Sequence, residues 1–145
     1  MNKKIVIFIN SLDGGGAERV ISTLLNNLVE KYECHLILME NKISYELDSR
    51  INIISLDENS HQSGMVKLLR LPIIAYKLNR IIKKYEFSLV ISFLHRANYV
   101  NVLAKYFSNH KAIISERIAS SSLYSDNSIT SKISNIIINK LYNKS

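Results

Sequence analysis

The opening of the chain constrains the fold most, because a strand-like run meets a helix-like run through three glycines. Residues 3–10 form a short, β-branched and nearly continuous apolar run, which is typical of a buried parallel strand. Residues 17–31 repeat apolar side chains at helical spacing on one face. Gly14, Gly15 and Gly16 lie between the two runs. Strand, glycine turn and helix in this order predict the start of a doubly wound, Rossmann-like domain.

The rest of the chain continues the same alternation. Further strands are expected at residues 34–39, 51–56, 87–93 and 111–115. Further helices are expected at residues 65–85, 97–107 and 129–142, with polar loops at residues 57–64 and 116–127. The predicted fold is therefore α/β, a Rossmann-like doubly wound parallel sheet in one domain spanning residues 1–145.

Composition supports a single globular domain. The chain has 145 residues, of which 47% are hydrophobic and 21% charged, enough for a real core and unlike a disordered chain. The sequence shows no signal-peptide pattern, no apolar run near 18 residues and only one cysteine, Cys34, so we expect a cytoplasmic protein. The sequence stops after an amphipathic helix that would normally cross to a further strand. We therefore expect a truncated or partial protein.

The carboxyl edge of the predicted sheet is the expected place for a ligand. Ligands bind there where the strand order reverses, which we expect between the first and fourth strands, so that loops 11–16, 94–98 and 116–122 converge. The glycines allow close approach, and the helix after them offers N–H groups and a positive dipole end to an anion. Glu18 suits the same dipole and competes for that place, which favours a sugar hydroxyl or a phosphate edge. A glycine turn used only for tight packing is the alternative.

Two familiar nucleotide-binding motifs are absent from this turn. The dinucleotide fingerprint needs a small residue where Arg19 stands. No Gly-Lys-Ser/Thr follows the glycines, which excludes a phosphate-binding P-loop. Glu40, at the end of the second strand, resembles the acid that holds a ribose in dehydrogenases, but a lone acid there is weak support.

Residues at two other strand ends carry candidate chemistry. His95 and Arg96 follow the fourth strand, and Glu116 and Arg117 follow the fifth. Each pair joins a proton-transfer group to a fixed cation, which makes His95 and Glu116 candidate catalytic residues. Asn98 ends the same loop as Arg96, and we group it with the two arginines as donor- or acceptor-binding. Solvated loop residues are the alternative. No residues have metal-ligand spacing.

The helix expected at residues 65–85 carries basic residues and no acid, within a chain of net charge +7. One side is apolar, and the other presents Lys67, Arg70, Lys77, Arg80 and Lys84 among exposed apolar residues. That pattern is typical of an interfacial helix on anionic lipid, where each basic residue adds about 1 kcal/mol. Pro72 should bend or interrupt the helix. An ordinary solvated face is the alternative, and nucleic acid fits less well because no reading motif is present.

The stretch IVIFINSLDGGGAERVISTLLNNL closely resembles the opening of family 4 glycosyltransferases of the GT-B fold. LVISFLHRANYVNVLA followed by AIISERIAS resembles their fourth and fifth strands in the branch that builds bacterial lipid-linked oligosaccharides, lipopolysaccharide and capsule. The resemblance covers nearly the whole chain. It implies the N-terminal, acceptor-side domain of a two-domain enzyme. The C-terminal domain of that family binds the nucleotide sugar and carries two glutamates eight residues apart, and nothing in this sequence corresponds to it.

The same resemblance implies residue roles. It places Gly15 and Gly16 near the donor phosphates and the acceptor. It places Glu116 and Arg117 at the cleft, where related enzymes often carry a histidine, so the identity of a general base stays open. Several relatives dock on membranes through a basic amphipathic helix of this domain, which matches residues 65–85.

We therefore expect part of a hexosyltransferase that moves a sugar from a nucleotide-diphosphate donor to a lipid-linked or polysaccharide acceptor, at the inner face of the plasma membrane. No cofactor is expected beyond the nucleotide sugar as co-substrate, and the 145 residues alone should not turn over. Two alternatives remain open. One is a non-catalytic module that binds a membrane or an acceptor, and the other is an NAD-dependent oxidoreductase.

Overall fold

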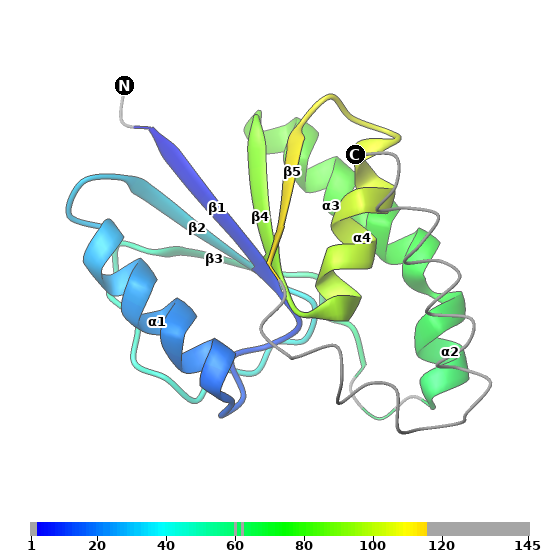
Figure 1. The fold of residues 1–145 in the computed structure, drawn as a ribbon, viewed down its shortest axis with the longest axis horizontal. Helices are drawn as coiled ribbons and strands as arrows, with labels where there is room; N and C mark the ends of the chain where they lie inside the picture. The colour runs from blue at the N-terminus through cyan, green and yellow to red at the C-terminus, as the bar shows by residue number, and fades with distance from the viewer. Residues whose placement is uncertain (1–2, 60, 62, 116–145) are drawn as a thin grey trace.

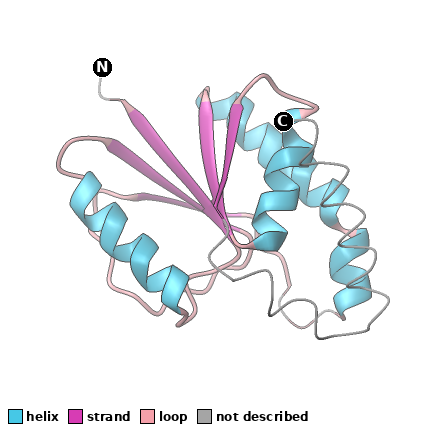
Figure 2. Ribbon diagram, viewed as in Figure 1, coloured by secondary structure: helices cyan, strands magenta, loops and turns pink. Residues whose placement is uncertain are grey.

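The computed structural model describes residues 3–59, 61 and 63–115 of the chain. Figure 1 shows α1 on one side of the sheet and α2, α3 and α4 on the other, and Figure 2 separates strands from helices in the same view. The elements in chain order are β1 (Lys4–Ile9), α1 (Gly16–Leu28), β2 (Glu33–Leu38), β3 (Asn52–Ser55), α2 (Gly64–Leu69), α3 (Leu71–Tyr85), β4 (Leu89–Phe93), α4 (His95–Lys105) and β5 (Lys111–Ser115). The predicted α/β fold with a parallel sheet is confirmed.

The sheet has the strand order β3-β2-β1-β4-β5, and every pair is parallel. Ile7 of β1 lies opposite Leu36 of β2 on one side and Ile91 of β4 on the other. The order therefore reverses between β1 and β4, as the sequence predicted. All five strand arrows point toward the lower centre of Figure 1, which is the carboxyl edge of the sheet.

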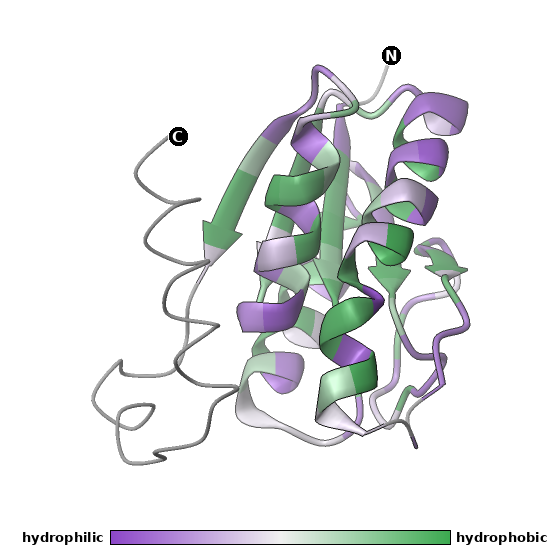
Figure 3. Cartoon of the chain, turned by 90° about the vertical axis from the view of Figure 1, so that its right-hand side faces the viewer, coloured by the Kyte–Doolittle hydropathy of each residue, from purple (hydrophilic) through white to green (hydrophobic). Residues whose placement is uncertain are grey.

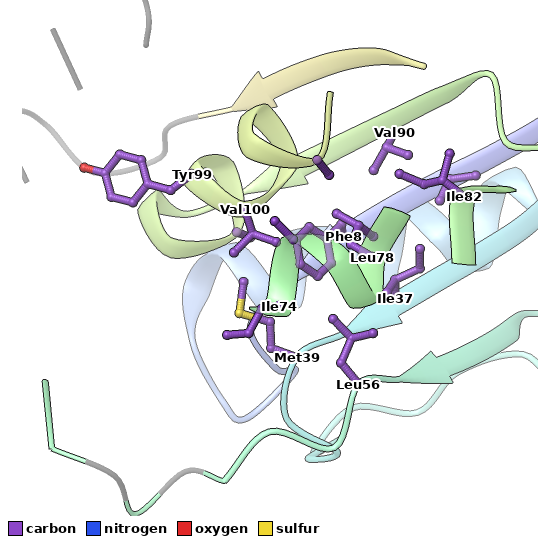
Figure 4. Packing of buried hydrophobic residues seen from close by; sticks show 14 of the residues in the cluster. Phe8, Ile37, Met39, Leu56, Ile74, Leu78, Ile82, Val90, Tyr99 and Val100 are labelled. Carbon is purple, nitrogen blue, oxygen red and sulfur yellow. The ribbon is translucent and has the colours of Figure 1, made fainter. Parts of the chain in front are cut away.

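Alternate residues of β1 point into different layers of the core. Val6 and Phe8 pack with α3 and α4, whereas Ile7 and Ile9 pack with α1, and all four are at most 1% exposed. Figure 4 shows Phe8 among side chains from the neighbouring strands and helices. Burying such a side chain fully contributes about 1.5–3 kcal/mol. A sheet covered on both sides explains why β1 reads as a continuous apolar run.

The helices differ in their bounds from those expected, most clearly in α1, which ends at Leu28 and not at residue 31, and in α4. The helix expected at 65–85 is broken at Arg70, which ends α2 and precedes α3, and Pro72 occupies the first turn of α3. Proline lacks the N–H that a continuous helix would need at that point, so the expected interruption is confirmed. Helix α4 begins at His95, two residues before the expected start, so His95 and Arg96 lie in its first turn.

Residues 39–51 join β2 to β3 without a helix, and residues 42–45 of this segment contact the loop after β1. Ile43 of this segment pairs with Leu12 in an isolated parallel bridge. The sequence analysis assigned no role to the segment. Cys34 of β2 is buried, as expected of a core residue, and burial raises the pKa of its thiol. The loop expected at 116–127 and the helix expected at 129–142 lie outside the described residues.

Candidate functional site

The β2–β3 segment holds the glycine turn after β1 through backbone and side-chain hydrogen bonds. Leu12 is fully buried, its N–H donates to the Lys42 carbonyl at 2.9 Å, and its carbonyl accepts from the Ser44 N–H at 2.9 Å. The Tyr45 hydroxyl donates to the Gly15 carbonyl at 2.8 Å. The turn is therefore held in one conformation. No pattern in residues 42–45 predicts this support, because it depends on how a loop without secondary structure folds.

The three glycines differ in whether their positions could hold a larger residue. Gly14 adopts φ +88°, a left-handed conformation that other residues rarely take. A Cβ atom on Gly15 would lie 2.1 Å from the Glu18 Oε2 atom. Gly16 has open space where a Cβ would lie and begins α1 in an ordinary conformation. Only Gly14 thus requires glycine for its backbone conformation, whereas at Gly15 a Cβ would have to displace the flexible end of the Glu18 side chain.

Glu18 folds back against the Gly15 backbone at the amino end of α1. Negative charge in the first turn of a helix is favoured by the helix dipole and the free N–H groups. The carboxylate therefore lies near the helix end that would also attract an incoming anion, and no side-chain hydrogen bond caps that end. The competition expected from the sequence stays a prediction. Residues 13–16 of the turn provide backbone shape at this edge and no cationic side chain, and the nearest cation in α1 is the exposed Arg19.

A second group lies where β1, β2 and β4 end side by side. Arg96, in the first turn of α4, donates from Nη1 to Glu40 Oε1 at 3.2 Å, and the two side chains are 17% and 13% exposed. The Glu40 N–H donates to the Asn10 carbonyl at 2.8 Å. Lys67 Nζ is 3.9 Å from Glu40 Oε1. The cluster thus joins the ends of three strands across the point where the strand order reverses.

Arg96 leaves most of its hydrogen-bonding capacity unused in the described part of the chain. Its Nε and Nη2 atoms are buried and have no hydrogen-bond partner there, and the same holds for Asn10 Oδ1. Nε and Nη2 form one edge of the guanidinium plane, the edge that binds phosphate or carboxylate with two parallel bonds. A buried donor without a partner costs about 1–3 kcal/mol. An oxyanion that accepted both hydrogen bonds would recover that cost.

The turn into α4 is itself strained. Leu94, which precedes the helix, adopts φ +70° and ψ 151°, an uncommon region for a residue with a side chain. Its N–H donates to the Ser115 carbonyl at 3.3 Å, and its carbonyl accepts from the Asn98 N–H at 2.9 Å. Asn98 is fully buried and donates from Nδ2 to the Ser115 carbonyl at 3.2 Å. Asn98 therefore fixes the start of α4 to the end of β5.

The structure brings together some of the predicted site residues. Gly14, Gly15, Gly16 and Glu18 form one turn, and His95, Arg96 and Asn98 form the next turn along the same edge. Glu116 and Arg117, together with the rest of loop 116–122, lie outside the described residues. The sequence analysis missed the pairing of Glu40 with Arg96. Glu40 was noted only as a ribose-type acid, and nothing in the sequence links it to a residue 56 positions later.

Four of the five predicted membrane-contact residues divide into two groups, and the fifth, Lys67, lies near Glu40. Arg70 donates to Glu58 from Nε at 3.0 Å and from Nη2 at 3.3 Å, and Lys77 Nζ donates to Glu58 Oε1 at 2.5 Å. The Glu58 side chain is fully buried. Burial alone would raise the pKa of Glu58, but the hydrogen bonds from Lys77 and Arg70 outweigh it and the pKa is lowered. Arg80 and Lys84 are exposed instead.

Two features are absent from the described part of the chain. No three or more of their histidine, cysteine, aspartate and glutamate side chains are grouped so that they could hold a metal ion. None of the helices formed by the described residues has the length and apolar character needed to cross a membrane.

Comparison with known proteins gives two relatives from Campylobacter jejuni subsp. jejuni, and no protein-family model matches the chain. An N-acetylgalactosamine-N,N'-diacetylbacillosaminyl-diphospho-undecaprenol 4-alpha-N-acetylgalactosaminyltransferase is 38% identical over 144 residues, which are 98% of this chain and 39% of the relative. A GalNAc-alpha-(1->4)-GalNAc-alpha-(1->3)-diNAcBac-PP-undecaprenol alpha-1,4-N-acetyl-D-galactosaminyltransferase is 30% identical over 114 residues, 78% of this chain and 32% of the relative. The chain therefore spans well under half the length of the relatives it matches.

Proposed function

We propose that this chain, a homologue of bacterial glycosyltransferases, is the acceptor-side domain of a family 4 enzyme with the GT-B fold. The enzyme moves a hexose or N-acetylhexosamine from a nucleotide-diphosphate sugar to a diphosphate-linked polyprenyl acceptor in cell-surface glycan synthesis. The observation that carries this proposal is the 38% identity, extending over 98% of the chain, to a transferase whose name states such an acceptor.

The carboxyl edge supports the proposal chemically. Donor and acceptor both carry a diphosphate, and Arg96 has two buried nitrogens available for an oxyanion at the point where the strand order reverses. We assign Arg96 to a diphosphate oxygen at this edge. Positive charge fixed near a leaving diphosphate stabilises the transition state without needing a metal or a covalent cofactor. His95 and Glu116 remain the candidates for proton transfer to or from the acceptor hydroxyl.

The NAD-dependent alternative loses its one supporting residue. Glu40 resembled the acid that holds the ribose of a dinucleotide, but its carboxylate accepts a hydrogen bond from Arg96 and is 13% exposed. Arg19 also occupies the position where the dinucleotide fingerprint needs a small residue. The binding-module alternative keeps its support, because every feature of the edge that would hold a diphosphate would also serve a protein that binds without transfer.

We further propose that the outward side of α2 and α3 docks on the anionic inner face of the plasma membrane. Large apolar side chains are exposed there, with Leu69 at 71% and Tyr76 at 58%, and Met65 and Ile73 each exceed half exposure. Figure 3 faces this side and shows hydrophobic and hydrophilic residues alternating along its helices. Exposed apolar residues beside lysine and arginine are what an interfacial helix presents to lipid.

The experiment that tests transfer uses the purified enzyme in which this domain is joined to a donor-binding domain, because the 145 residues alone should not turn over. It is supplied with UDP-N-acetylgalactosamine and a short polyprenyl diphosphate that carries an N-acetylgalactosamine-terminated saccharide. Mass spectrometry of the lipid product should show the addition of one N-acetylhexosamine. A panel of other UDP-sugars covers a different donor preference. Binding of the acceptor with no transfer from any donor would favour the binding module, and NAD(H) binding by fluorescence would revive the oxidoreductase.

A further inference from the structure

A groove beside β3 is lined by basic side chains that are not part of the candidate site. It lies between the end of β3, an edge strand, and the outer side of α3, and its volume is about 460 Å³. The residues that line it are Ser55, Leu56, Lys77, Arg80, Ile81 and Lys84. Three of these six are basic, and no carboxylate is among them.

The positive charge of the groove is only partly neutralised. Glu58 is the acid bound to Lys77, but it also accepts two hydrogen bonds from Arg70, so one carboxylate faces two cations. Arg80 and Lys84 are exposed, and neither forms a recorded ion pair within the described residues. Asp57 accepts a hydrogen bond from Ser55 at 2.7 Å without lining the groove. A net positive field therefore remains at the groove.

The groove also continues an apolar surface. Ile73, Tyr76, Arg80 and Lys84 follow each other at three- and four-residue steps, so they share one side of α3. The first two are exposed apolar residues and the last two are basic. Leu56 and Ile81 give the groove itself an apolar wall. A free phosphate ion would gain nothing from apolar neighbours, whereas a lipid offers a phosphate and hydrocarbon together.

We propose that this groove binds the phosphate headgroup of an anionic membrane lipid, held by Arg80 and Lys84 with Lys77 beside them. The inference rests on the membrane docking proposed above and makes it more specific. Docking then depends on a discrete site on α3 and not on the overall charge of the chain. The apolar residues on α2 and at the start of α3 enter the membrane surface, while the groove receives a headgroup.

The test compares two charge-matched double variants of the purified protein. In the first, Arg80→Gln and Lys84→Gln remove the two exposed cations of the groove. In the second, Lys83→Gln and Lys111→Gln remove two exposed cations outside it. Binding is measured by flotation with vesicles of phosphatidylcholine containing phosphatidylglycerol, and with vesicles of phosphatidylcholine alone. All four positions are exposed, so circular dichroism should show both variants folded.

We expect the groove variant to bind phosphatidylglycerol vesicles about thirty-fold more weakly than the wild type, from about 1 kcal/mol for each basic residue. The control variant should lose no more than a few-fold. Equal losses in the two variants would show diffuse attraction and overturn the headgroup site while leaving docking intact. A wild type that ignores phosphatidylglycerol vesicles would overturn the docking proposal and this inference together. Sugar transfer measured on a soluble acceptor is independent of both.

Discussion

Two strand-to-helix turns lie next to each other at the carboxyl edge, and they differ in what they leave open. The turn from β1 to α1 has three glycines and a helix end, but its own Glu18 lies against Gly15 where an anion would sit. The turn from β4 to α4 has no glycine, yet Arg96 there has two buried nitrogens without a partner in the described residues. Glu18 lies at the turn that resembles an anion site, whereas the less conspicuous turn holds buried hydrogen-bond donors without a partner.

Polar groups without a hydrogen-bond partner therefore indicate a binding site better than residues that only shape the backbone. The chain's own carboxylates occupy several places that the sequence offers to a ligand. Glu18 covers the amino end of α1, Glu58 binds Arg70 and Lys77, and Glu40 takes one nitrogen of Arg96. One edge of the Arg96 guanidinium and the exposed cations of α3 have no such carboxylate partner among the described residues. Substitutions at these residues test the contrast between the two turns.

The largest effect is expected at Arg96. Arg96→Gln removes the two unpaired donors, and sugar transfer should fall by about 10²–10³ in kcat/KM, the cost of losing a preorganised oxyanion donor. Arg96→Lys keeps the charge but cannot offer two parallel bonds, so it should recover only a small part of the activity. Arg19→Gln makes the same change of charge at the α1 turn and serves as the matched control, with an expected loss of a few-fold at most.

Arg96→Gln also leaves Glu40 without its partner, so a structural cause must be separated from a lost ligand contact. The double variant Arg96→Gln with Glu40→Gln removes the unpaired carboxylate. If the double variant regains wild-type transfer, Arg96 acts only by neutralising Glu40 and the comparison between the two turns fails. Thermal unfolding of each variant checks that the sheet edge stays folded.

The second largest effect is expected at Glu58, where a buried carboxylate holds two cations. Glu58→Gln should lower the free energy of unfolding by about 3 kcal/mol, because breaking a buried ion pair leaves charge without its partner. The lowered pKa of Glu58 also predicts a pH dependence. Its contribution is fully present above pH 4.3, the usual pKa of glutamate, and is lost as the pH falls through the lower pKa of the folded state.

Urea unfolding of wild type and Glu58→Gln between pH 3 and pH 7 checks this prediction. The difference between the two proteins should shrink toward the acid end. A constant difference across this range would mean that Glu58 contributes by packing and not by charge. The matched control is Glu46→Gln, because Glu46 forms no recorded ion pair within the described residues and its replacement should change stability by less than about 0.5 kcal/mol.

The ion pairs of Glu58 and Glu40 could not be predicted from the sequence, although most of the fold could. The strands, their parallel order and the reversal beside β1 follow from apolar runs that alternate with amphipathic helices, so they were predictable. The interruption near Pro72 followed from the chemistry of proline. The contacts of Glu58 and of Glu40 were not predictable, because they depend on loop paths after β2 and β3 that no periodicity describes.

The candidate site was also predictable only in part. The sequence identified the edge and named Arg96, because parallel strands must end together. It placed His95 and Arg96 in a loop, whereas they form the first turn of α4, since the conformation of Leu94 that starts the helix early has no sequence signal. It could not tell which cations would be neutralised, because partners such as Arg96 and Glu40 meet only after folding.

A smaller effect is expected at Gly15. In Gly15→Ala the new methyl group meets the Glu18 carboxylate, which can swing away because it is the end of a flexible side chain. The loss should be about 1 kcal/mol in the free energy of unfolding, the value of a charge well placed at a helix end. In a Glu18→Gln background the carboxylate charge is already gone, so adding Gly15→Ala should cost clearly less. Equal costs in both backgrounds would mean that Glu18 does not close the turn.

The smallest effect is expected at Gly16, and its sign is opposite. A Cβ there meets nothing within 4 Å, the backbone is already helical, and alanine reduces the freedom of the unfolded chain. Gly16→Ala should therefore raise the free energy of unfolding by about 0.5 kcal/mol. Gly14→Ala is the control within the same turn and should lower stability by about 1 kcal/mol, because alanine resists φ +88°. Sugar transfer sharpens the result further. If Gly16→Ala is stable but inactive, a substrate approaches the backbone at Gly16, and the α1 turn takes part in binding despite Glu18.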